Sequence, residues 1–264
     1  MRNLKEKVVW ITGASSGIGE ELAYALAREG SFLILSARNK EKLEQVKAKC
    51  LEYTPKCWVY PVDLSANQHW DALVKTVLAQ VGHIDVLINN AGRSQRSLAK
   101  ETPIEIDRNI MELNFFSVVA LTKLVLPQML ENGSGHVVVI SSIAGKLGFP
   151  MRTAYSASKH ALQGYFESLR AELTNDNIKI TIVSPGRIKT NISVNALIKD
   201  GSTYNRMDEG QANGMSPACC AAKIVTAIKK ERKELLVGKT EILMVYIRRF
   251  LPSLYHKLVT LINN

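Results

Sequence analysis

Tyr155 and Lys159 lie four residues apart in the sequence, and together they could move a proton. On a helix, residues with this spacing lie on the same face, so the phenol and the ammonium would meet. Free tyrosine has a pKa of about 10, and the Lys159 ammonium and an oxidised nicotinamide ring would both favour the phenolate, so together they could bring the pKa of Tyr155 toward neutrality. Such a tyrosine could give a proton to a ketone oxygen as a hydride arrives, while Ser142 donates a hydrogen bond to the same oxygen.

A glycine-rich segment, Thr12–Gly19, has the pattern of a phosphate-binding turn. Gly13 permits a tight turn, Gly17 lets a phosphate approach the backbone, and Gly19 allows a helix to pack closely on a strand. The N–H groups at the start of the following helix would then face a pyrophosphate. The spacing is G-x-x-x-G-x-G rather than G-x-G-x-x-G, and a glycine-rich turn without a ligand is the alternative to a dinucleotide site.

The cofactor choice depends on the residues that follow the second and third apolar runs. A ribose-binding carboxylate is expected about 20 residues beyond the first glycine, yet Leu35–Lys40 contains none. Arg38 could pair bidentately with a 2′-phosphate, which favours NADP(H) over NAD(H), with a solvated charge at a helix start as the alternative. Asp63, followed by Leu64, would suit the adenine edge, with a helix N-cap as the competing interpretation.

Short Val- and Ile-rich runs alternate with longer amphipathic segments along the chain. The runs predict strands at Val8–Thr12, Phe32–Ser36, Cys57–Pro61, Val86–Asn89, Val137–Ser141, Ile178–Ser184 and Glu234–Val237. The other segments predict helices at Ile18–Arg28, Lys40–Leu51, Trp70–Val81, Ile104–Met129, Ala154–Leu173 and Pro217–Lys230. Asn39 is expected to cap the second helix and Pro103 to occupy the first turn of the fourth.

This alternation predicts an α/β fold with a single doubly wound, Rossmann-type parallel sheet of about seven strands and helices on both faces. Ligands of such sheets bind at the carboxyl ends of the strands, where the motifs above lie. We expect one dinucleotide-binding and catalytic domain over residues 1–238, in which residues 191–215 form a mobile lid over the substrate pocket, and a distinct tail over residues 239–264.

Composition excludes several classes of protein. Among 264 residues there are 34 Lys+Arg and 24 Asp+Glu, a formal net charge of +10, and 46% of residues are hydrophobic, too many for a disordered chain. Four cysteines cannot build a disulfide scaffold. The first apolar run is too short for a signal peptide, so we expect a cytoplasmic location. No aromatic–basic motif supports nucleic-acid binding, and none is expected.

Taken together, the motifs resemble the short-chain dehydrogenase/reductase family across almost the whole chain. The matching pieces are Thr12-Gly13-(x3)-Gly17-Ile18-Gly19, Asn89-Asn90-Ala91-Gly92, Asn114, Ser142 placed 13 residues before Tyr155, Tyr155-Ser-Ala-Ser-Lys159, and Pro185-Gly186-(x3)-Thr190. The resemblance implies a catalytic tetrad of Asn114, Ser142, Tyr155 and Lys159, and no metal.

The resemblance also assigns roles to these residues. Tyr155 would be the general acid/base, Ser142 would orient the carbonyl, Lys159 would lower the tyrosine pKa and hold the nicotinamide ribose, and Asn114 would fix a proton-relaying water. Asn90 would stabilise the sheet and the cofactor, and Thr190 would contact the nicotinamide or a phosphate. The cofactor-binding residues expected are Gly13, Ser15, Ser16, Gly17, Ile18, Gly19, Arg38, Asp63, Leu64, Asn90, Ala91, Gly92, Tyr155, Lys159, Pro185, Gly186 and Thr190.

Basic residues gather in the loops that should rim the substrate pocket. They are Arg93, Arg96, Lys100, Lys146, Arg152, Arg187 and Lys189. They suggest a substrate with an anionic handle such as a phosphate, a carrier-protein thioester or a coenzyme A group, with solvated surface charge as the alternative.

The tail, Ile242–Ile262, is long enough to span a bilayer, but Arg248 and Arg249 would lie mid-span at about 2.5–3.5 kcal/mol each. Pro252 should split it into two short helices. Its basic, amphipathic character predicts peripheral contact with an anionic membrane, with a subunit contact or a flap over the pocket as alternatives. The apolar face is expected at Ile247, Leu251, Leu254, Leu258 and Leu261.

The tail and the stretch Thr190–Ser202 resemble the member 7B-like branch of the family, which implies lipid-type ketones as substrates. The leading hypothesis is therefore an NADPH-dependent carbonyl reductase acting on a small-molecule ketone or alcohol. A 3-oxoacyl thioester reductase and a non-catalytic dinucleotide-sensing protein are the alternatives. The resemblance further implies a homodimer or homotetramer in which Ile104–Met129 and Ala154–Leu173 pair across a dimer axis.

Overall fold

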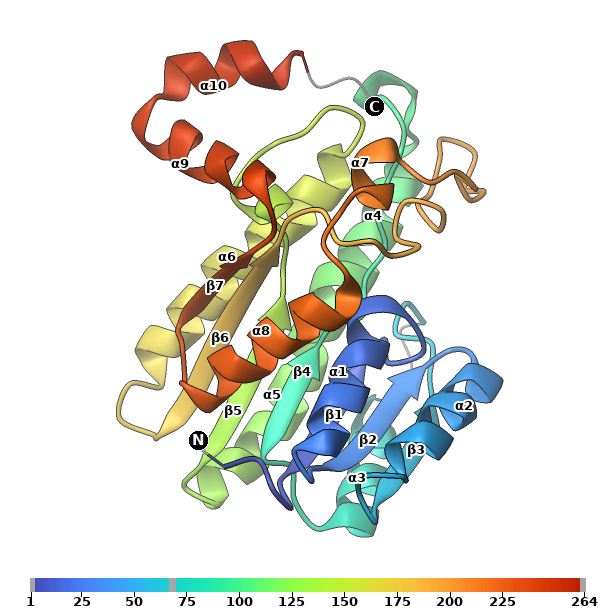
Figure 1. Cartoon of the computed structure of the whole chain (residues 1–264), viewed down its shortest axis with the longest axis vertical. Helices are drawn as coiled ribbons and strands as arrows, with labels where there is room; N and C mark the ends of the chain where they lie inside the picture. Colours follow the sequence, from blue (N-terminus) through green and yellow to red (C-terminus); the bar gives the residue numbers. More distant parts are fainter. Residues whose placement is uncertain (1–2, 67–69, 262–264) are drawn as a thin grey trace.

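A seven-stranded parallel sheet forms the centre of the molecule (Figure 1). The computed structural model describes residues 3–66 and 70–261; Met1 and Arg2 of the expected first domain, and residues 262–264 of the expected tail, lie outside these ranges. The strands run in the order β3-β2-β1-β4-β5-β6-β7. Their bounds are β1 Val8–Thr12, β2 Phe32–Ala37, β3 Cys57–Pro61, β4 Val86–Asn89, β5 Gly135–Ile140, β6 Ile178–Pro185 and β7 Glu234–Val237.

The order of the strands reverses between β1 and β4, which pair directly through Trp10 and Leu87. In an open α/β sheet the crevice at such a reversal is where a ligand binds. The expected doubly wound, Rossmann-type fold is thus confirmed.

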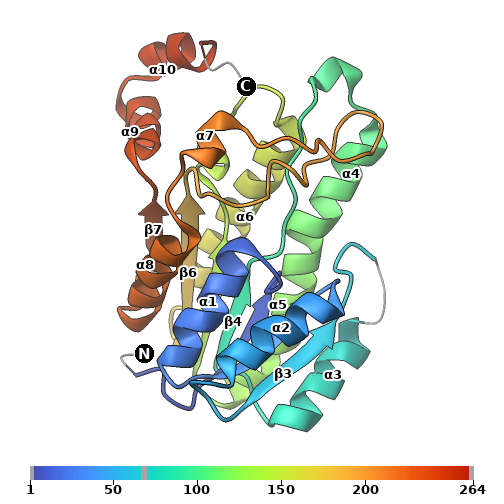
Figure 2. The same cartoon turned by 45° about the vertical axis from the view of Figure 1, so that its right-hand side comes forward.

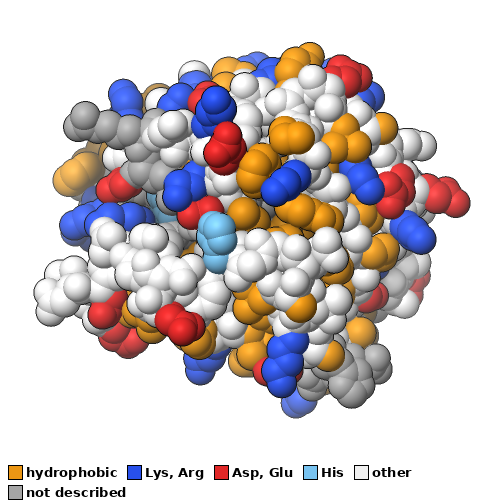
Figure 3. Space-filling model, turned by 90° about the horizontal axis from the view of Figure 1, so that it is seen from below, with side chains coloured by type: hydrophobic (Ala, Val, Ile, Leu, Met, Phe, Trp, Pro, Cys, Tyr) orange, Lys and Arg blue, Asp and Glu red, His pale blue; other side chains and the backbone are white. Residues whose placement is uncertain are grey.

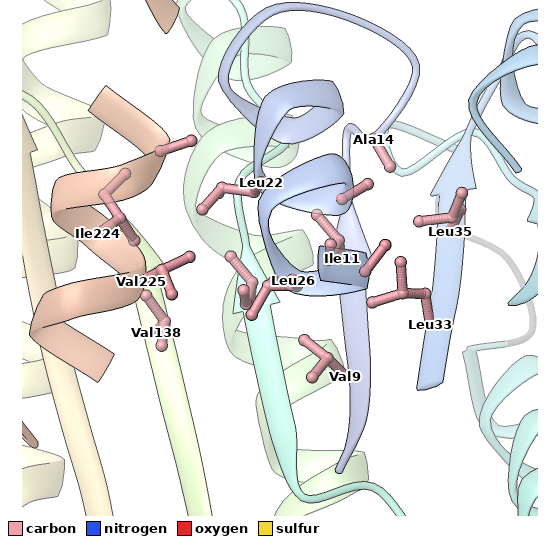
Figure 4. Close-up of a cluster of buried hydrophobic side chains, with 14 of the residues drawn as sticks. Val9, Ile11, Ala14, Leu22, Leu26, Leu33, Leu35, Val138, Ile224 and Val225 are labelled. Atoms are coloured by element: carbon pink, nitrogen blue, oxygen red, sulfur yellow. The ribbon is translucent and has the colours of Figure 1, made fainter. Parts of the chain in front are cut away.

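Ten α-helices connect the described strands or follow them (Figures 1 and 2). They are α1 Gly17–Arg28, α2 Lys40–Cys50, α3 Trp70–Val81, α4 Ile104–Met111, α5 Ser117–Glu131, α6 Thr153–Glu172, α7 Glu209–Ala212, α8 Pro217–Lys229, α9 Leu243–Phe250 and α10 Pro252–Val259. Successive side chains of a strand point to opposite faces of the sheet, so each strand contributes to the hydrophobic cores on both faces. Val9 and Ile11 face α1 and α8 (Figure 4), in a cluster that also includes residues of α2, whereas Val8 and Trp10 face α3, α5 and α6.

The predicted elements agree with the observed ones to within one or two residues, except for the long fourth helix. That segment forms α4 and α5 joined by one π-helical turn, η2 (Glu112–Phe116), and α5 continues past Met129 to Glu131. Asn39 caps α2 as expected, because its side chain accepts from the Lys42 N–H at 2.8 Å. Pro103 is not in the first turn; it precedes α4 as the N-cap residue.

The segment Ile104–Glu131 is long and apolar enough to cross a membrane by length and composition alone. Its inner face packs on α3 and on strands β4 and β5, which accounts for much of that apolar character. Its outer face leaves Ile104, Phe116 and Leu130 exposed. Core helices of compact α/β proteins share this composition.

The segment between β6 and α8 crosses the carboxyl ends of the strands and returns to its starting point (Figure 2). Its base is closed by a bridge between Ile188 and Met215, and its middle is held by a bridge between Gln95 and Leu197. We call residues 188–215 the cover segment. A lid that moves over the substrate would therefore have to move against two backbone bridges, a restraint that its polar composition does not reveal.

The C-terminal helices α9 and α10 project beyond β7 and separate at Pro252, as expected (Figure 1). Tyr255 is buried and its hydroxyl donates to the carbonyl of Gly148 at 2.7 Å, while Arg248 donates to the carbonyl of Lys146. The tail is therefore held against the loop that follows β5. At the opposite, amino end of the sheet, basic and acidic side chains are scattered among apolar ones (Figure 3).

Candidate active site

A cavity of about 980 Å³ opens at the carboxyl ends of the strands, beneath the cover segment. It runs from the first glycine turn, past the loops after β4 and β5, to helix α6. Every expected site residue lines it except Gly19 and Asn114, which lie behind its wall. The lining ones are Gly13, Ser15, Ser16, Gly17, Ile18, Arg38, Asp63, Leu64, Asn90, Ala91, Gly92, Ser142, Tyr155, Lys159, Pro185, Gly186 and Thr190.

The glycine turn has a backbone that other residues adopt only with strain. Gly13 and Gly17 have φ values of +64° and +62°. A β-carbon on Gly19 would overlap the carbonyl oxygen of Gly13 and lie 2.5 Å from the Asn90 amide nitrogen. The glycines thus keep a cradle of backbone N–H groups open at the start of α1, which fits the pyrophosphate of a dinucleotide.

Asn90 and Thr12 join this turn to the loop after β4. The Asn90 amide donates to the carbonyls of Thr12 at 2.9 Å and Gly13 at 3.1 Å. The Thr12 hydroxyl in turn accepts from the N–H groups of Asn90 at 3.0 Å and Ala91 at 3.1 Å. Thr12 is part of the motif seen in the sequence, but its role in joining the two loops was not foreseen.

The end of the cavity at β2 is basic. Arg38, Arg93 and Lys42 line it together with Asp63. Burial raises the pKa of Asp63, but hydrogen bonds from Ser65 and the charges of Arg38 and Arg93 outweigh it, so the pKa lies below its ordinary value. Burial and the nearby Arg38 lower the pKa of Arg93. Arg93 thus belongs to this end rather than to the substrate rim where it was expected, and Lys42 was not foreseen.

Asn114 lies in the π-helical turn, a feature often found at functional sites. Its side-chain oxygen accepts from the Arg93 N–H at 2.9 Å, and its amide donates to the Arg93 carbonyl at 2.9 Å and to Ser158 at 3.0 Å. A β-carbon on Gly92 would lie 3.2 Å from that oxygen and 3.4 Å from Lys159 Nζ. Asn114 therefore fixes the backbone beside Lys159 from behind the cavity wall.

Tyr155 and Lys159 lie on one face of α6, and both are buried. Lys159 Nζ is 5.9 Å from the centre of the Tyr155 ring and donates to the carbonyl of Ile140 at 2.8 Å. Ser142, just after β5, accepts from the Ala144 N–H at 3.1 Å. A phenol, a hydroxyl and an ammonium thus converge where a carbonyl could be polarised and protonated.

Burial governs the pKa values of this pair. It raises the pKa of Tyr155, and the hydrogen bond with Ser142 and the charges of Arg96 and Arg152 offset this only in part. Desolvation of the phenolate thus outweighs the favourable electrostatics of the chain's own groups, and the lowering expected from Lys159 together with an oxidised nicotinamide ring stays a prediction. Burial also lowers the pKa of Lys159 to about 8.

The other expected basic residues divide between the cavity and the surface. Arg96, Arg152 and Arg187 line the cavity. Lys146 instead approaches Glu234 at 3.4 Å and Glu167 at 3.7 Å. The remaining two, Lys100 and Lys189, are exposed and do not line it. Residues 3–66 and 70–261 contain no group of three His, Cys, Asp or Glu side chains that could hold a metal ion.

Comparison with known proteins decides the family. Residues 7–200 match the family model described as short chain dehydrogenase. The chain belongs to the short-chain dehydrogenase/reductase family. It is therefore an oxidoreductase of a family that binds nicotinamide dinucleotides.

Curated relatives extend the match over nearly the whole chain. A Dehydrogenase/reductase SDR family protein 7-like from Drosophila melanogaster is 44% identical over 96% of this chain and 79% of its own length. Dehydrogenase/reductase SDR family member 7B from Xenopus laevis is 42% identical over 97% of this chain and 82% of its own. These matches confirm the resemblance to the 7B-like branch.

Solved structures share the fold. A short-chain dehydrogenase from Streptomyces avermitilis has a TM-score of 0.80 at 32% identity, covering 97% of this chain and 96% of that one. An alcohol dehydrogenase from the archaeon Thermococcus sibiricus, complexed with 5-hydroxy-NADP, has a TM-score of 0.76 at 26% identity, covering 89% and 97%.

Replacing Lys159 with methionine should stabilise the fold at pH 7. Below pH 8 the lysine is charged in both states, so the native state bears the full cost of burying the ammonium. A shift from 10.5 to about 8 corresponds to about 3 kcal/mol, less roughly 1 kcal/mol for the lost hydrogen bond to Ile140. Between pH 8 and 10.5 the unfolded state binds more protons than the native state, so the stability of wild type rises with pH. The difference in stability between Lys159→Met and wild type therefore narrows.

Urea unfolding of wild type and Lys159→Met at several pH values would measure this difference. Lys123→Met, at an exposed position of α5, is the matched control and should show no comparable gain. A Lys159→Met variant that is less stable than wild type at pH 7 would contradict the expected burial cost.

Proposed function

We propose that this protein is an NADP(H)-dependent oxidoreductase that interconverts a ketone and a secondary alcohol. The observation that carries the proposal is the convergence of Tyr155, Ser142 and Lys159 in the same cavity as the glycine cradle. The substrate class is a ketone of lipid-like or anionic character, because the cavity joins apolar walls to arginine side chains.

Residues of the chain would divide the chemistry as follows. Bound in the cradle, the nicotinamide cofactor would supply or accept the hydride. Tyr155 would give its proton to the carbonyl oxygen during reduction and recover it from Lys159, whose lowered pKa makes that transfer easier. Ser142 would donate a hydrogen bond to the same oxygen. Asn114 acts as a positioning residue, because its three hydrogen bonds reach Arg93 and Ser158 rather than the cavity.

Tyr155→Phe should abolish reduction of any ketone that the wild type accepts, because the phenylalanine ring has no proton to donate. We expect kcat to fall by about 100- to 10,000-fold, measured as loss of NADPH absorbance. Tyr165→Phe is the control, since that half-buried tyrosine of α6 packs between Phe115 and Phe166. Undiminished turnover by Tyr155→Phe would refute the mechanism, and binding of NADPH without turnover by wild type would point to a dinucleotide sensor.

The preference for NADP(H) is proposed from the charge around the β2 end of the cavity. Arg38, Lys42 and Arg93 line it, and the carboxylate that lines it with them, Asp63, accepts hydrogen bonds from Ser65. Three cations would attract the 2′-phosphate of NADP(H), and the planar Arg38 guanidinium could bind it bidentately. The complex of the Thermococcus sibiricus relative with an NADP analogue is consistent with this preference.

Arg38→Ala should raise the KM for NADPH by roughly tenfold or more, because a hydrogen bond to a charged group contributes about 1.5–3 kcal/mol. The KM for NADH should change little, since NADH has no 2′-phosphate. Lys40→Ala, an exposed cation two residues away that does not line the cavity, is the control. Equal effects on NADPH and NADH would show that Arg38 does not contact the 2′-phosphate.

We also propose that the protein is a homodimer or homotetramer. The outer face of α4 and α5 exposes Ile104 and Phe116, and Phe115 beside them packs edge-to-face on Tyr165 of α6. An apolar surface of this kind on two neighbouring helices is typical of a subunit contact.

The tail, residues 239–264, is proposed to lie on the anionic, cytoplasmic surface of a membrane. Its described part exposes six large apolar side chains, of which Phe250 and Leu261 are each 73% exposed. Arg249 and Lys257 are exposed on the same two helices. The apolar surface differs from the expected face, because Ile247 and Leu258 are half-buried. The exposed residues are Leu243, Tyr246, Phe250, Leu251, Leu254 and Leu261.

The double variant Phe250→Ser/Leu261→Ser should lose flotation with vesicles of phosphatidylserine and phosphatidylcholine, because burial of these side chains contributes about 1.5–3 kcal/mol each. Wild type should float better with these vesicles than with pure phosphatidylcholine. Tyr53→Ser, which removes an aromatic group that is 53% exposed in the loop after α2, is the control. Equal flotation of wild type and the double variant would exclude this membrane contact.

A further inference from the structure

Two arginines in the cavity share one carboxylate. Arg96 donates to Asp208 Oδ2 from Nε at 3.0 Å and from Nη2 at 2.6 Å, and Arg152 donates to the same oxygen from Nη2 at 3.1 Å. The arginine side chains are only 4% and 16% exposed, and that of Asp208 12%. These three residues, which we call the arginine–aspartate triad, line the cavity together with Tyr155.

The two arginines come from outside the cover segment. Within the loop after β4, Arg96 Nη1 donates to the Ser94 hydroxyl at 2.6 Å and to the Gln95 carbonyl at 2.7 Å. Its backbone N–H donates to the carbonyl of Leu197, in the middle of the cover segment, at 2.8 Å. Arg152 directly precedes α6, three residues before Tyr155. The Arg96 guanidinium is thus held by its own loop, and the Arg152 guanidinium donates to the carbonyl of Pro150 at 3.3 Å beside the start of the helix that carries Tyr155.

Asp208, in contrast, comes from the cover segment, where it directly precedes the four-residue helix α7. Burial raises its pKa, but the hydrogen bonds and charges of Arg96 and Arg152 outweigh burial and keep the pKa below its ordinary value. The carboxylate is therefore ionised near neutral pH. It balances one of the two guanidinium charges, so the three residues together carry one more positive than negative charge, on side chains that are at most 16% exposed.

A buried positive excess beside a reaction centre favours an anionic ligand. Two guanidinium groups that converge on one oxygen have the geometry with which arginines bind carboxylate and phosphate groups. Asp208 already supplies an anionic oxygen at this point, so its carboxylate occupies the position that a ligand's anionic oxygen would take.

We propose that Arg96 and Arg152 form a subsite for an anionic group, carboxylate or phosphate, of the ketone substrate, and that Asp208 is the exchangeable counter-ion of this subsite. The proposal rests on the ketone reduction proposed above and names the substrate class. On binding, the substrate's anion displaces the Asp208 carboxylate from the arginines, and the released α7 end of the cover segment turns toward solvent. Asp208 thereby sets specificity, because only an anion can compete with it.

Two substitutions should act in opposite directions on the preference for anionic substrates. Arg152→Gln removes a guanidinium, so the ratio of kcat/KM for a keto acid to that for its methyl ester should fall by roughly tenfold. Asp208→Asn removes the competing charge at nearly constant shape, so the same ratio should rise. Asp200→Asn, at an exposed carboxylate of the cover segment, is the control and should leave the ratio unchanged.

If the triad served only to fasten the cover segment, both substitutions would change the two substrates equally, and the ratio would not move. That result would overturn the proposal, as would a ratio that falls in both variants. A ketone phosphate monoester compared with its parent hydroxyketone forms a second arm, which distinguishes a phosphate from a carboxylate as the preferred anion.

Calorimetric titration with inorganic phosphate separates the subsite from the reaction. Asp208→Asn should bind phosphate more tightly than wild type, and Arg152→Gln more weakly. Phosphate binding with these opposite shifts but no turnover of any ketone would support the subsite and reject the proposed function. Turnover with identical phosphate affinities in all three proteins would reject the subsite alone.

Discussion

The close contact between the glycine turn and the loop after β4 determines the geometry of the rest of the site. The Asn90 amide bonds to two carbonyls of the turn, and no side chain could replace the hydrogen atom of Gly19 without separating them. This contact lies where the strand order reverses, so it joins the two halves of the sheet as well as the two walls of the cavity. The loop it fixes continues through Gly92 to Arg93, where Asn114 holds it from behind.

Tyr155 and Lys159 are buried, and the free energy that it costs to remove them from water must be offset by packing of the surrounding core. An ammonium and a phenol lie almost completely inside an apolar helix–sheet interface, and desolvation shifts both pKa values toward the neutral forms. Burial of this kind lowers the local dielectric constant and so strengthens the charge interactions of these two groups. The charges of Arg96 and Arg152 also act on Tyr155, whose pKa they lower, because their side chains are only 4% and 16% exposed.

Local sequence patterns predicted most of the helices and strands. They missed the features that depend on contacts between distant parts of the chain. Short, continuous runs rich in Val and Ile placed β1 and β4 to the residue, because these central strands are buried on both faces of the sheet. The π-helical turn around Asn114 was missed because Glu112–Phe116 has the composition of an ordinary helix. The tetrad motif brought Tyr155 and Lys159 to the cavity, yet their pKa values depend on burial, which spacing does not reveal. Arg93, Lys42 and Asp208 acquire their neighbours only when distant loops meet.

The bridge between Ile188 and Met215 brings the two ends of a 28-residue excursion together at one point. Residues between these ends can therefore be inserted, deleted or replaced without changing the spacing of β6 and α8, because the bridge between Ile188 and Met215 fixes that spacing. The cover segment can therefore vary in length and sequence while the reacting groups beneath it keep their positions. Substrate specificity can thus change through substitutions in the cover segment, while Tyr155, Ser142 and Lys159 are under separate selection for catalysis.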